Sequence, residues 1–368
     1  MNYARNKEFG NVINKVIGGQ HLTQKESYAA FCEVLNNEVS DLQQGAFLAA
    51  LTTKGETSDE IAGGWQAIYE VDTNKTSLPL PDTLIDNCGT GMDSFKTFNI
   101  STASSIIAAA GGLTIARHGA RAISSKCGTV DVAEELGVDV ECPVDIVADS
   151  IISSGLGLFN GMSAQVHPNA LGRILSQINF GSPLNIAASL ANPAFPRQAV
   201  RGVYSKTMIA PVIEVMKKIG YQNALVIHGD INQTGKGIDE ASVCGTTYCY
   251  HLTNGQIKIF EFEPNEVGLQ CYHADEIAAR PTITNSAQHI VRLLSGEEKG
   301  ACEDIVVLNS ALLFYVAKKV DSIEEGIELS RDLIENRMAK EKLQQWVTSQ
   351  NQIPAKGMNK LLGYLKAA

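Results

Sequence analysis

The sequence contains no long apolar segment and no export signal. No apolar run approaches the ~20 residues that a helix needs to span a bilayer. The opening residues, MNYARNKEFG, lack the apolar stretch of a signal peptide. We therefore expect the protein to stay in the cytoplasm.

Paired cysteines and an excess of basic residues are also absent. The 8 cysteines are scattered without a CxxC pair, which argues against a zinc site or a disulfide framework. Acidic residues outnumber basic ones by 40 to 30, whereas nucleic-acid backbones select for basic surfaces. This balance disfavours general nucleic-acid binding, but it is compatible with a local cationic pocket for a small phosphorylated ligand.

The length and the helix signals predict a small helical domain beside a larger one. A chain of 368 residues with 44% hydrophobic and 19% charged residues is typical of a globular protein with ample core. The first 75 residues predict four helices, three of which begin with capping boxes at 23–26, 40–43 and 57–60. A Pro-containing linker at 77–83 then changes the composition.

The remainder of the chain predicts an α/β domain with a mainly parallel central sheet. Short apolar strands are expected at 83–88, 113–117 and 224–229, with helices between them. Two further strands around the turn TNGQ predict a hairpin. From residue 283 onward, the spacing predicts three helices, of which the last covers 323–347.

The segment 166–195 shows helical spacing that breaks at the sequence GSP, and we expect it to return and pack on the N-terminal helices. The expected domains are therefore 1–76, with 166–195 packed on it, and an α/β domain formed by 77–165 and 196–368.

Three polar clusters follow the predicted strands, where open α/β sheets bind their ligands. The first is GTGMDSFKTFNIST at 89–102, whose glycines and following helix start suit phosphate oxygens. It matches neither of the two common phosphate-loop fingerprints, and a capped turn is the structural alternative.

The second cluster, at 117–131, supplies Arg117, His118, Arg121 and Lys126 with hydroxyl side chains; a solvated loop is the alternative. The third is the pair Asp239 and Glu240, which offers hard oxygen ligands for Mg²⁺ but is compatible with a plain turn. His167 and His228 are also candidates, although an ordinary hydrogen-bonded histidine is the more frequent case for each.

Taken together and in this order, the clusters resemble the anthranilate phosphoribosyltransferase family across nearly the whole chain. The family's G-T-G-G-D-x-x-x-T-F-N-[IV]-S-T corresponds to 89–102, and its K-H-G-N-R-x-x-S-S-x-x-G-[ST]-x-D corresponds to 117–131. Its G-[LM]-D-E corresponds to 237–240, downstream of His228 and Gly229.

The resemblance implies a fold and a reaction. Enzymes of this family join C1 of 5-phosphoribosyl 1-diphosphate (PRPP) to the amino nitrogen of anthranilate in tryptophan biosynthesis and release pyrophosphate. They combine a small helical domain with an α/β domain of the nucleoside phosphorylase and phosphoribosyltransferase type, and they usually form homodimers. We expect the dimer interface on the N-terminal helices.

The resemblance also implies site residues. Mg²⁺ would be held by Ser101, Asp239 and Glu240. Arg117 would stand where the family has a lysine facing the diphosphate. The residues expected to bind PRPP are Gly89, Gly91, Asp93, Thr97, Asn99, Ser101, Thr102, Arg117, Ser125 and Thr129.

Departures from the family motifs gather on the acceptor side. Met92 replaces a loop glycine, Ala120 replaces the asparagine that contacts anthranilate, Gln177 stands at the position of an arginine that faces its carboxylate, and Ser189 replaces a proline. Together with His118 and His167 these residues define the expected acceptor site. The pattern indicates a divergent member that retains phosphoribosyl transfer with an altered acceptor pocket, in which Arg121 or Arg173 could replace the lost cation so that anthranilate is still admitted.

Two other functions stay open. A nucleoside phosphorylase shares the broad fold, but the Asp-Glu pair suits a diphosphate better than free phosphate. A catalytically silent member would bind nucleic acid or a protein partner, and a salt-sensitive gel shift with DNA would favour it. Mg²⁺-dependent binding of PRPP would favour the enzyme.

Overall fold

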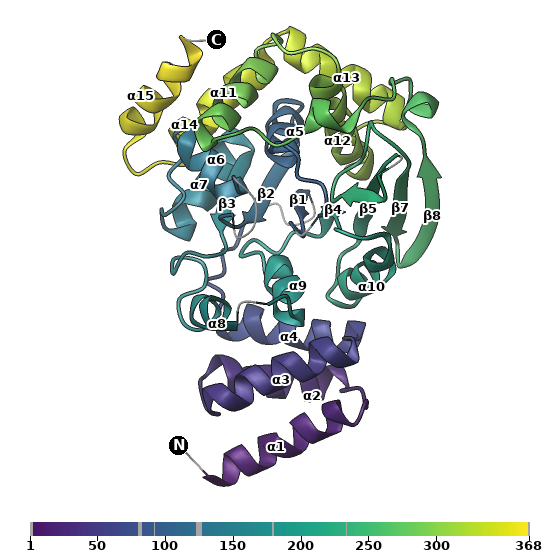
Figure 1. Ribbon diagram of the computed structural model, residues 1–368. Helices are drawn as coiled ribbons and strands as arrows, with labels where there is room; N and C mark the ends of the chain where they lie inside the picture. Colours follow the sequence, from purple (N-terminus) through teal and green to yellow (C-terminus); the bar gives the residue numbers. More distant parts are fainter. Residues whose placement is uncertain are drawn as a thin grey trace.

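The N-terminal part of the protein is a bundle of helices, as predicted. The computed structural model describes residues 3–79, 83–91, 93–122, 127–178, 180–232 and 234–366. The bundle consists of α1 (Tyr3–Ile17), α2 (Gln24–Leu35), α3 (Asp41–Lys54) and α4 (Ser58–Val71), stacked at one end of the molecule (Figure 1). Phe9 and Phe31 both pack edge-on against Phe47 in its core.

The predicted capping boxes are confirmed at two of the three positions. The hydroxyls of Thr23 and Thr57 accept hydrogen bonds from the N–H groups of Glu26 and Glu60, whose carboxylates accept from the two threonine N–H groups in return. The prediction is wrong at Ser40, which occupies the N-cap of α3 without a side-chain hydrogen bond.

Two helices from the middle of the sequence pack on this bundle. α8 (Leu171–Ile178) and α9 (Pro183–Leu190) share an apolar cluster with α1–α4. The indole N–H of Trp65 donates to the carbonyl of Leu190 at 2.9 Å, and the Asp72 carboxylate accepts from the backbone N–H groups of residues 169–171. On this packing we propose the domain division expected from the sequence, with 166–195 belonging to the helical domain.

A mixed, mostly parallel sheet forms the centre of the larger domain (Figure 1). Its order in the described ranges is β3-β2-β1-β4-β5-β7-β8, and β6 pairs with β5. The first five strands of this order are parallel, and β6, β7 and β8 are antiparallel. The strands are β1 (Leu84–Gly89), β2 (Thr114–Gly119), β3 (Leu156–Asn160), β4 (Gln198–Gly202), β5 (Asn223–Ile231), β6 (Lys236–Ile238), β7 (Thr247–Thr253) and β8 (Gln256–Phe262).

The three predicted apolar strands are confirmed as β1, β2 and β5. The hairpin is confirmed as β7 and β8, and the positive φ angles of Asn254 and Gly255 make its tight turn. β3, β4 and β6 were not predicted; β6 spans only residues 236–238, and Arg201 interrupts the apolar pattern of β4.

Helices cover both faces of the sheet. Ile85, Val200 and Leu225 point to the face covered by α5 (Ile100–Ala110) and α12 (Ala301–Val316), whereas Ala199 and Val226 point to the face covered by α10 (Ile209–Lys218) and α9. The remaining α-helices are α6 (Thr129–Glu135), α7 (Val144–Ser154), α11 (Ile283–Leu294), α13 (Ile323–Glu335), α14 (Met338–Ser349) and α15 (Pro354–Leu365).

The single helix predicted over 323–347 is wrong. Arg337 adopts a left-handed conformation with φ of 62° and separates α13 from α14, and α15 follows as an unpredicted helix. Within the described parts of the chain, no helix has both the length and the apolar character needed to cross a membrane.

The contact of α2 with α4 gives a stability test. A Cβ on Gly63 of α4 would lie 2.7 Å from both the Cβ of Ser27 and the backbone nitrogen of Tyr28, whereas a Cβ on Gly45 of α3 would meet nothing within 4 Å. We expect Gly63→Ala to lower the free energy of unfolding by about 1–3 kcal/mol through overpacking. Gly45→Ala is the matched control and should raise it by roughly 0.5–1 kcal/mol. Urea unfolding followed by circular dichroism checks both, and equal stability of the two variants would contradict the packing described.

Candidate active site

The first and third polar clusters meet at the end of β1. The N–H of Gly91 donates to Oδ2 of Asp239 at 2.7 Å, although the two residues are 148 positions apart. A Cβ on Gly89 would collide with the same carboxylate, and one on Gly202 would collide with the Asp239 backbone. The absence of side chains at the ends of β1 and β4 therefore lets Asp239 approach the glycine loop.

The second cluster joins the site through Arg117. Its side chain, 2% exposed, donates from Nη1 to Thr102 Oγ1 and from Nη2 to Ser101 Oγ, both at 2.9 Å. Its Nε donates to the carbonyl of Asn87 at 3.0 Å. These bonds fix a positive charge beside the first turn of α5.

That first turn is suited to an anion. Asn99 occupies the N-cap position of α5 but makes no side-chain cap; its amide instead donates to the carbonyl of Cys127 at 3.2 Å. The N–H groups at the start of a helix carry partial positive charge. The first turn of α5 and the Arg117 guanidinium therefore both favour an anion at this place.

Carboxyl groups crowd the opposite side of the loop. Burial, and then the charge of Asp239, raise the pKa of Asp93 to about 6, against the nearby ammonium of Lys96 at 3.2 Å. The same two causes raise the pKa of Glu240 well above its usual value. Such crowding favours a bound cation.

The carboxylates also fit a magnesium ion that is bound together with a phosphate ligand. The described residues contain no group of three or more His, Cys, Asp or Glu side chains able to hold a metal ion by themselves. Mg²⁺ commonly uses one or two carboxylates and completes its shell with phosphate oxygens and water. Asp239 and Glu240, with the Ser101 hydroxyl, therefore suit an ion that arrives with its substrate.

Three of the six expected acceptor residues, His118, His167 and Ser189, gather on the other face of the sheet. The rings of His118 and His167 approach to 3.3 Å between their Nε2 atoms, and Nδ1 of His118 lies 3.4 Å from the carbonyl of Ser189. Burial, and then the neighbouring His167, lower the pKa of His118 to about 3, and burial also lowers the pKa of His167. Both imidazoles are therefore neutral at physiological pH.

Sequence reasoning missed two charged residues behind Ser189. Arg201, 1% exposed, donates from Nη2 to the Ser189 hydroxyl. Burial raises the pKa of Asp86 to about 6, although the charges of Arg201 and Arg117 act in the opposite direction. The available signal was a charged residue next to apolar residues in each of two strands, LIDNCG and QAVRG.

The other predicted residues are more dispersed. Thr97 pairs with Ala278, and Thr129 begins α6 beside the end of β2. Ala120 and Gln177 are exposed, the latter on α8. Met92, Ser125 and Lys126 lie outside the described residues.

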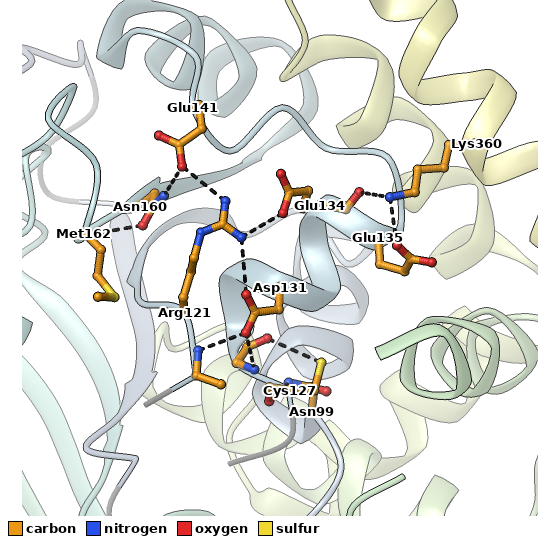
Figure 2. A network of polar contacts seen from close by, with 12 residues as sticks. Asn99, Arg121, Cys127, Asp131, Glu134, Glu135, Glu141, Asn160, Met162 and Lys360 are labelled. Atoms are coloured by element: carbon orange, nitrogen blue, oxygen red, sulfur yellow. Dashed lines mark hydrogen bonds and ion pairs between the residues drawn. The ribbon is translucent and has the colours of Figure 1, made fainter. Parts of the chain in front are cut away.

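The guanidinium of Arg121 is engaged by three carboxylates of its own domain (Figure 2). Its Nη1 donates to Glu134 at 2.7 Å and to Asp131 at 3.3 Å, and its Nη2 donates to Glu141 at 3.2 Å. Arg173 donates to Gln44 and to the carbonyl of Val34. The structure therefore does not support the expectation that Arg121 or Arg173 replaces the family's acceptor-side arginine.

A polar cavity of about 360 Å³ lies beside the glycine loop. Nδ1 of His228 lies 2.8 Å from the carbonyl of Val203, and the ring lines this cavity with Ser94, Asp230 and Lys236. The loop between β5 and β6 that forms one wall was not predicted from the sequence.

Comparison with known proteins agrees with this geometry. The glycosyl transferase family, a/b domain, matches residues 81–340, and the helical bundle domain of the same family matches residues 11–71. The fold and the site thus define a glycosyltransferase. More narrowly, the chain belongs to the anthranilate phosphoribosyltransferase family, which confirms the resemblance.

Named relatives cover nearly all of the chain. The anthranilate phosphoribosyltransferase of Methanobrevibacter smithii is 34% identical over 340 residues, which is 92% of this chain and 98% of that protein. The crystal structure of the Thermus thermophilus enzyme is 31% identical with a TM-score of 0.83, covering 92% of this chain and 98% of that one. The Saccharomyces cerevisiae enzyme in complex with PRPP and Mg has the same fold, with a TM-score of 0.82 at 21% identity over 94% of this chain and 99% of that one.

The crowded carboxyls predict a pH-dependent stability. The pKa of Asp93 in the folded protein, about 6, is above its ordinary value of 3.8. Its contribution to the free energy of unfolding is therefore fully present below pH 3.8 and is lost as the pH rises through 6. Relative to the wild type, Asp93→Asn should gain on the order of 1–2 kcal/mol between about pH 4.5 and pH 7. Urea unfolding at both pH values measures this difference, and a pH-independent difference would contradict the electrostatic account.

Proposed function

We propose that this protein transfers the phosphoribosyl group of PRPP to the amino nitrogen of anthranilate, or of a related small aromatic or heterocyclic amine, and releases pyrophosphate. The observation that carries the proposal is the convergence of the glycine loop, Arg117 and Asp239 at the end of β1. The named relatives support the same reaction.

PRPP would bind along the glycine loop and the start of α5. Gly89 admits the Asp239 carboxylate, which accepts the N–H of Gly91, and Asp93, Thr97 and Asn99 belong to the same loop. The other residues assigned to PRPP are Ser101, Thr102, Arg117, Ser125 and Thr129. Arg117 keeps the positive charge of the family's lysine, but its guanidinium is held in one orientation by Ser101 and Thr102.

Mg²⁺ would be held by Ser101, Asp239 and Glu240 and would neutralise charge on the leaving diphosphate. The protein residues act by position and electrostatics: Arg117 and the α5 N-terminus stabilise negative charge on the departing oxygens. The buried carboxyls of Asp93 and Glu240 would favour positive charge nearby, both on the ribosyl carbon as it becomes cation-like and on a metal ion. An arylamine is sufficiently nucleophilic that no strong base is required.

The acceptor would bind on the side of His118, His167 and Ser189. The neutral imidazoles offer hydrogen-bonding groups without a positive charge. The buried Arg201 behind Ser189 adds a fixed cation on this side. Met92, Ala120 and Gln177 remain assigned to the acceptor side from the motif alone, and these changes support an altered acceptor preference.

The assembly is a separate part of the proposal. We propose a homodimer whose interface lies on the N-terminal helices, where Leu42 and Ile17 are 87% and 68% exposed. The role in tryptophan biosynthesis and the cytoplasmic location stay predictions.

The reaction is tested by measuring pyrophosphate released from PRPP in the presence of Mg²⁺ across a panel of arylamines and heterocyclic amines that includes anthranilate. We expect acceptor-dependent release with at least one compound. Absence of turnover with every acceptor, together with absence of PRPP binding, would refute the transferase proposal and favour a catalytically silent protein.

The metal assignment is tested by a double variant with a matched control. Asp239→Ala with Glu240→Ala should reduce turnover by at least about 100-fold, because it removes the groups that hold the charge-neutralising ion. Circular dichroism should show that the variant is folded. Glu324→Ala with Glu325→Ala changes an exposed acidic pair on α13 and should leave turnover unchanged. Equal turnover in the two double variants would remove the metal assignment.

A further inference from the structure

A second polar cavity lies beside Phe98, which belongs to the glycine loop. It has a volume of about 250 Å³ and is built from α11 and the segments at its two ends. Its lining residues are Arg280, Asn285, Gln288, His289, Arg292 and Glu298. None of these residues belongs to the site described above.

The hydrogen bonding of His289 leaves a buried donor without an acceptor. Nη2 of Arg280 lies 2.8 Å from Nε2 of His289. Because a guanidinium only donates, Nε2 must accept, and the ring proton must be on Nδ1. Nδ1 is buried and has no hydrogen-bond partner among the described residues, and His289 as a whole residue is 7% exposed.

The surrounding charges favour an anion. Burial, and then the charges of Arg280 and Arg292, lower the pKa of His289 to about 3, so the ring is neutral at physiological pH. The lining contains two guanidiniums and one carboxylate, and Arg292 Nε lies 3.2 Å from Glu298 Oε1. The amides of Asn285 and Gln288 add further donors. A buried N–H left unpaired is unfavourable, and an oxyanion would supply the missing acceptor.

The cavity is connected directly to the glycine loop. The ring of Phe98 lies edge-on to His289 at 4.7 Å between centroids, and the Arg280 guanidinium carbon lies 5.6 Å from the Phe98 centroid. Ala279 donates its N–H to the carbonyl of Lys96 at 2.9 Å, and Ala278 pairs with Thr97. A ligand that shifts Arg280 or His289 therefore acts on the residues that lead into Asn99 and Ser101.

We propose that this cavity is a regulatory site for a phosphate group, free or carried by a small metabolite, and that its occupancy is coupled to PRPP binding through Phe98. The phosphate oxygens would accept from Nδ1–H of His289 and from the guanidiniums of Arg280 and Arg292. Arg292 would exchange part of its contact with Glu298 for the ligand. Because coupling between two ligands is reciprocal, PRPP must change the affinity for phosphate by the same factor.

The site is tested by titrating the full-length protein with inorganic phosphate and following histidine ring signals by ¹⁵N-resolved NMR. The His289 signal is identified by its loss in His289→Asn. We expect it to shift in the wild type, and we expect Arg292→Gln to need roughly tenfold more phosphate, since one charge-assisted hydrogen bond is lost. Arg337→Gln changes an exposed arginine and serves as the control with an unchanged midpoint. An unresponsive His289, or an equal midpoint in Arg292→Gln, would overturn the proposal.

Repeating the titration with saturating PRPP and Mg²⁺ separates this cavity from the active site. We expect the His289 shift to persist with a midpoint changed by at least about threefold. Loss of the shift would mean that phosphate had acted through the active site, and an unchanged midpoint would refute the coupling. If PRPP itself does not bind but His289 still responds to phosphate, the transferase proposal fails while the phosphate site stands.

Additional titration with glycerol 3-phosphate distinguishes free phosphate from a phosphate monoester. A lower midpoint for glycerol 3-phosphate would indicate a small phosphorylated metabolite as the ligand. A lower midpoint for inorganic phosphate would identify the free ion. A response to neither compound would refute the site.

Discussion

The structure of the active site depends on the close approach of Asp239 to the glycine loop. Gly89 and Gly202 end two neighbouring strands, and a side chain on either would collide with Asp239. The Asp239 carboxylate then accepts the N–H of Gly91, which fixes the course of the loop. Without this contact, the carboxylates and the start of α5 would not share one site.

The alternation of side chains along β2 divides the site into two halves. Arg117 points to the face of the sheet that carries α5, where it contacts Ser101 and Thr102. The next residue, His118, points to the opposite face, where it meets Ser189 of α9 and His167. One strand end thereby supplies a cation to the face on which we propose that PRPP binds, and an imidazole to the face on which we propose that the acceptor binds. Among the departures from the family motifs, Ser189 lies on this second face, and Ala120 and Gln177 are exposed.

Local signals made much of the fold predictable from the sequence. The capping boxes at Thr23 and Thr57 and the turn at Asn254 depend on neighbouring residues, and the structure confirms them. Arg337 could not be recognised as a helix break, because a left-handed arginine has no distinctive local pattern. β4 was missed because the buried Arg201 breaks its apolar pattern.

The candidate site was likewise predictable only where local sequence patterns define it. Motif order identified the glycine loop, Arg117 and the Asp-Glu pair, whose convergence the structure describes. The roles of Arg121 and Arg201 depend on tertiary neighbours: three carboxylates engage the former, and Ser189 engages the latter. A sequence motif contains no information about such partners.

The central claim is that the glycine loop and the carboxylates form one binding site for PRPP with a divalent cation. Isothermal titration calorimetry of the wild-type protein with PRPP, with and without MgCl₂, tests it most directly. The account predicts saturable binding with Mg²⁺ and binding at least about tenfold weaker without it, a difference of roughly 1.4 kcal/mol. Equal affinity in both conditions, or no binding in either, would contradict it.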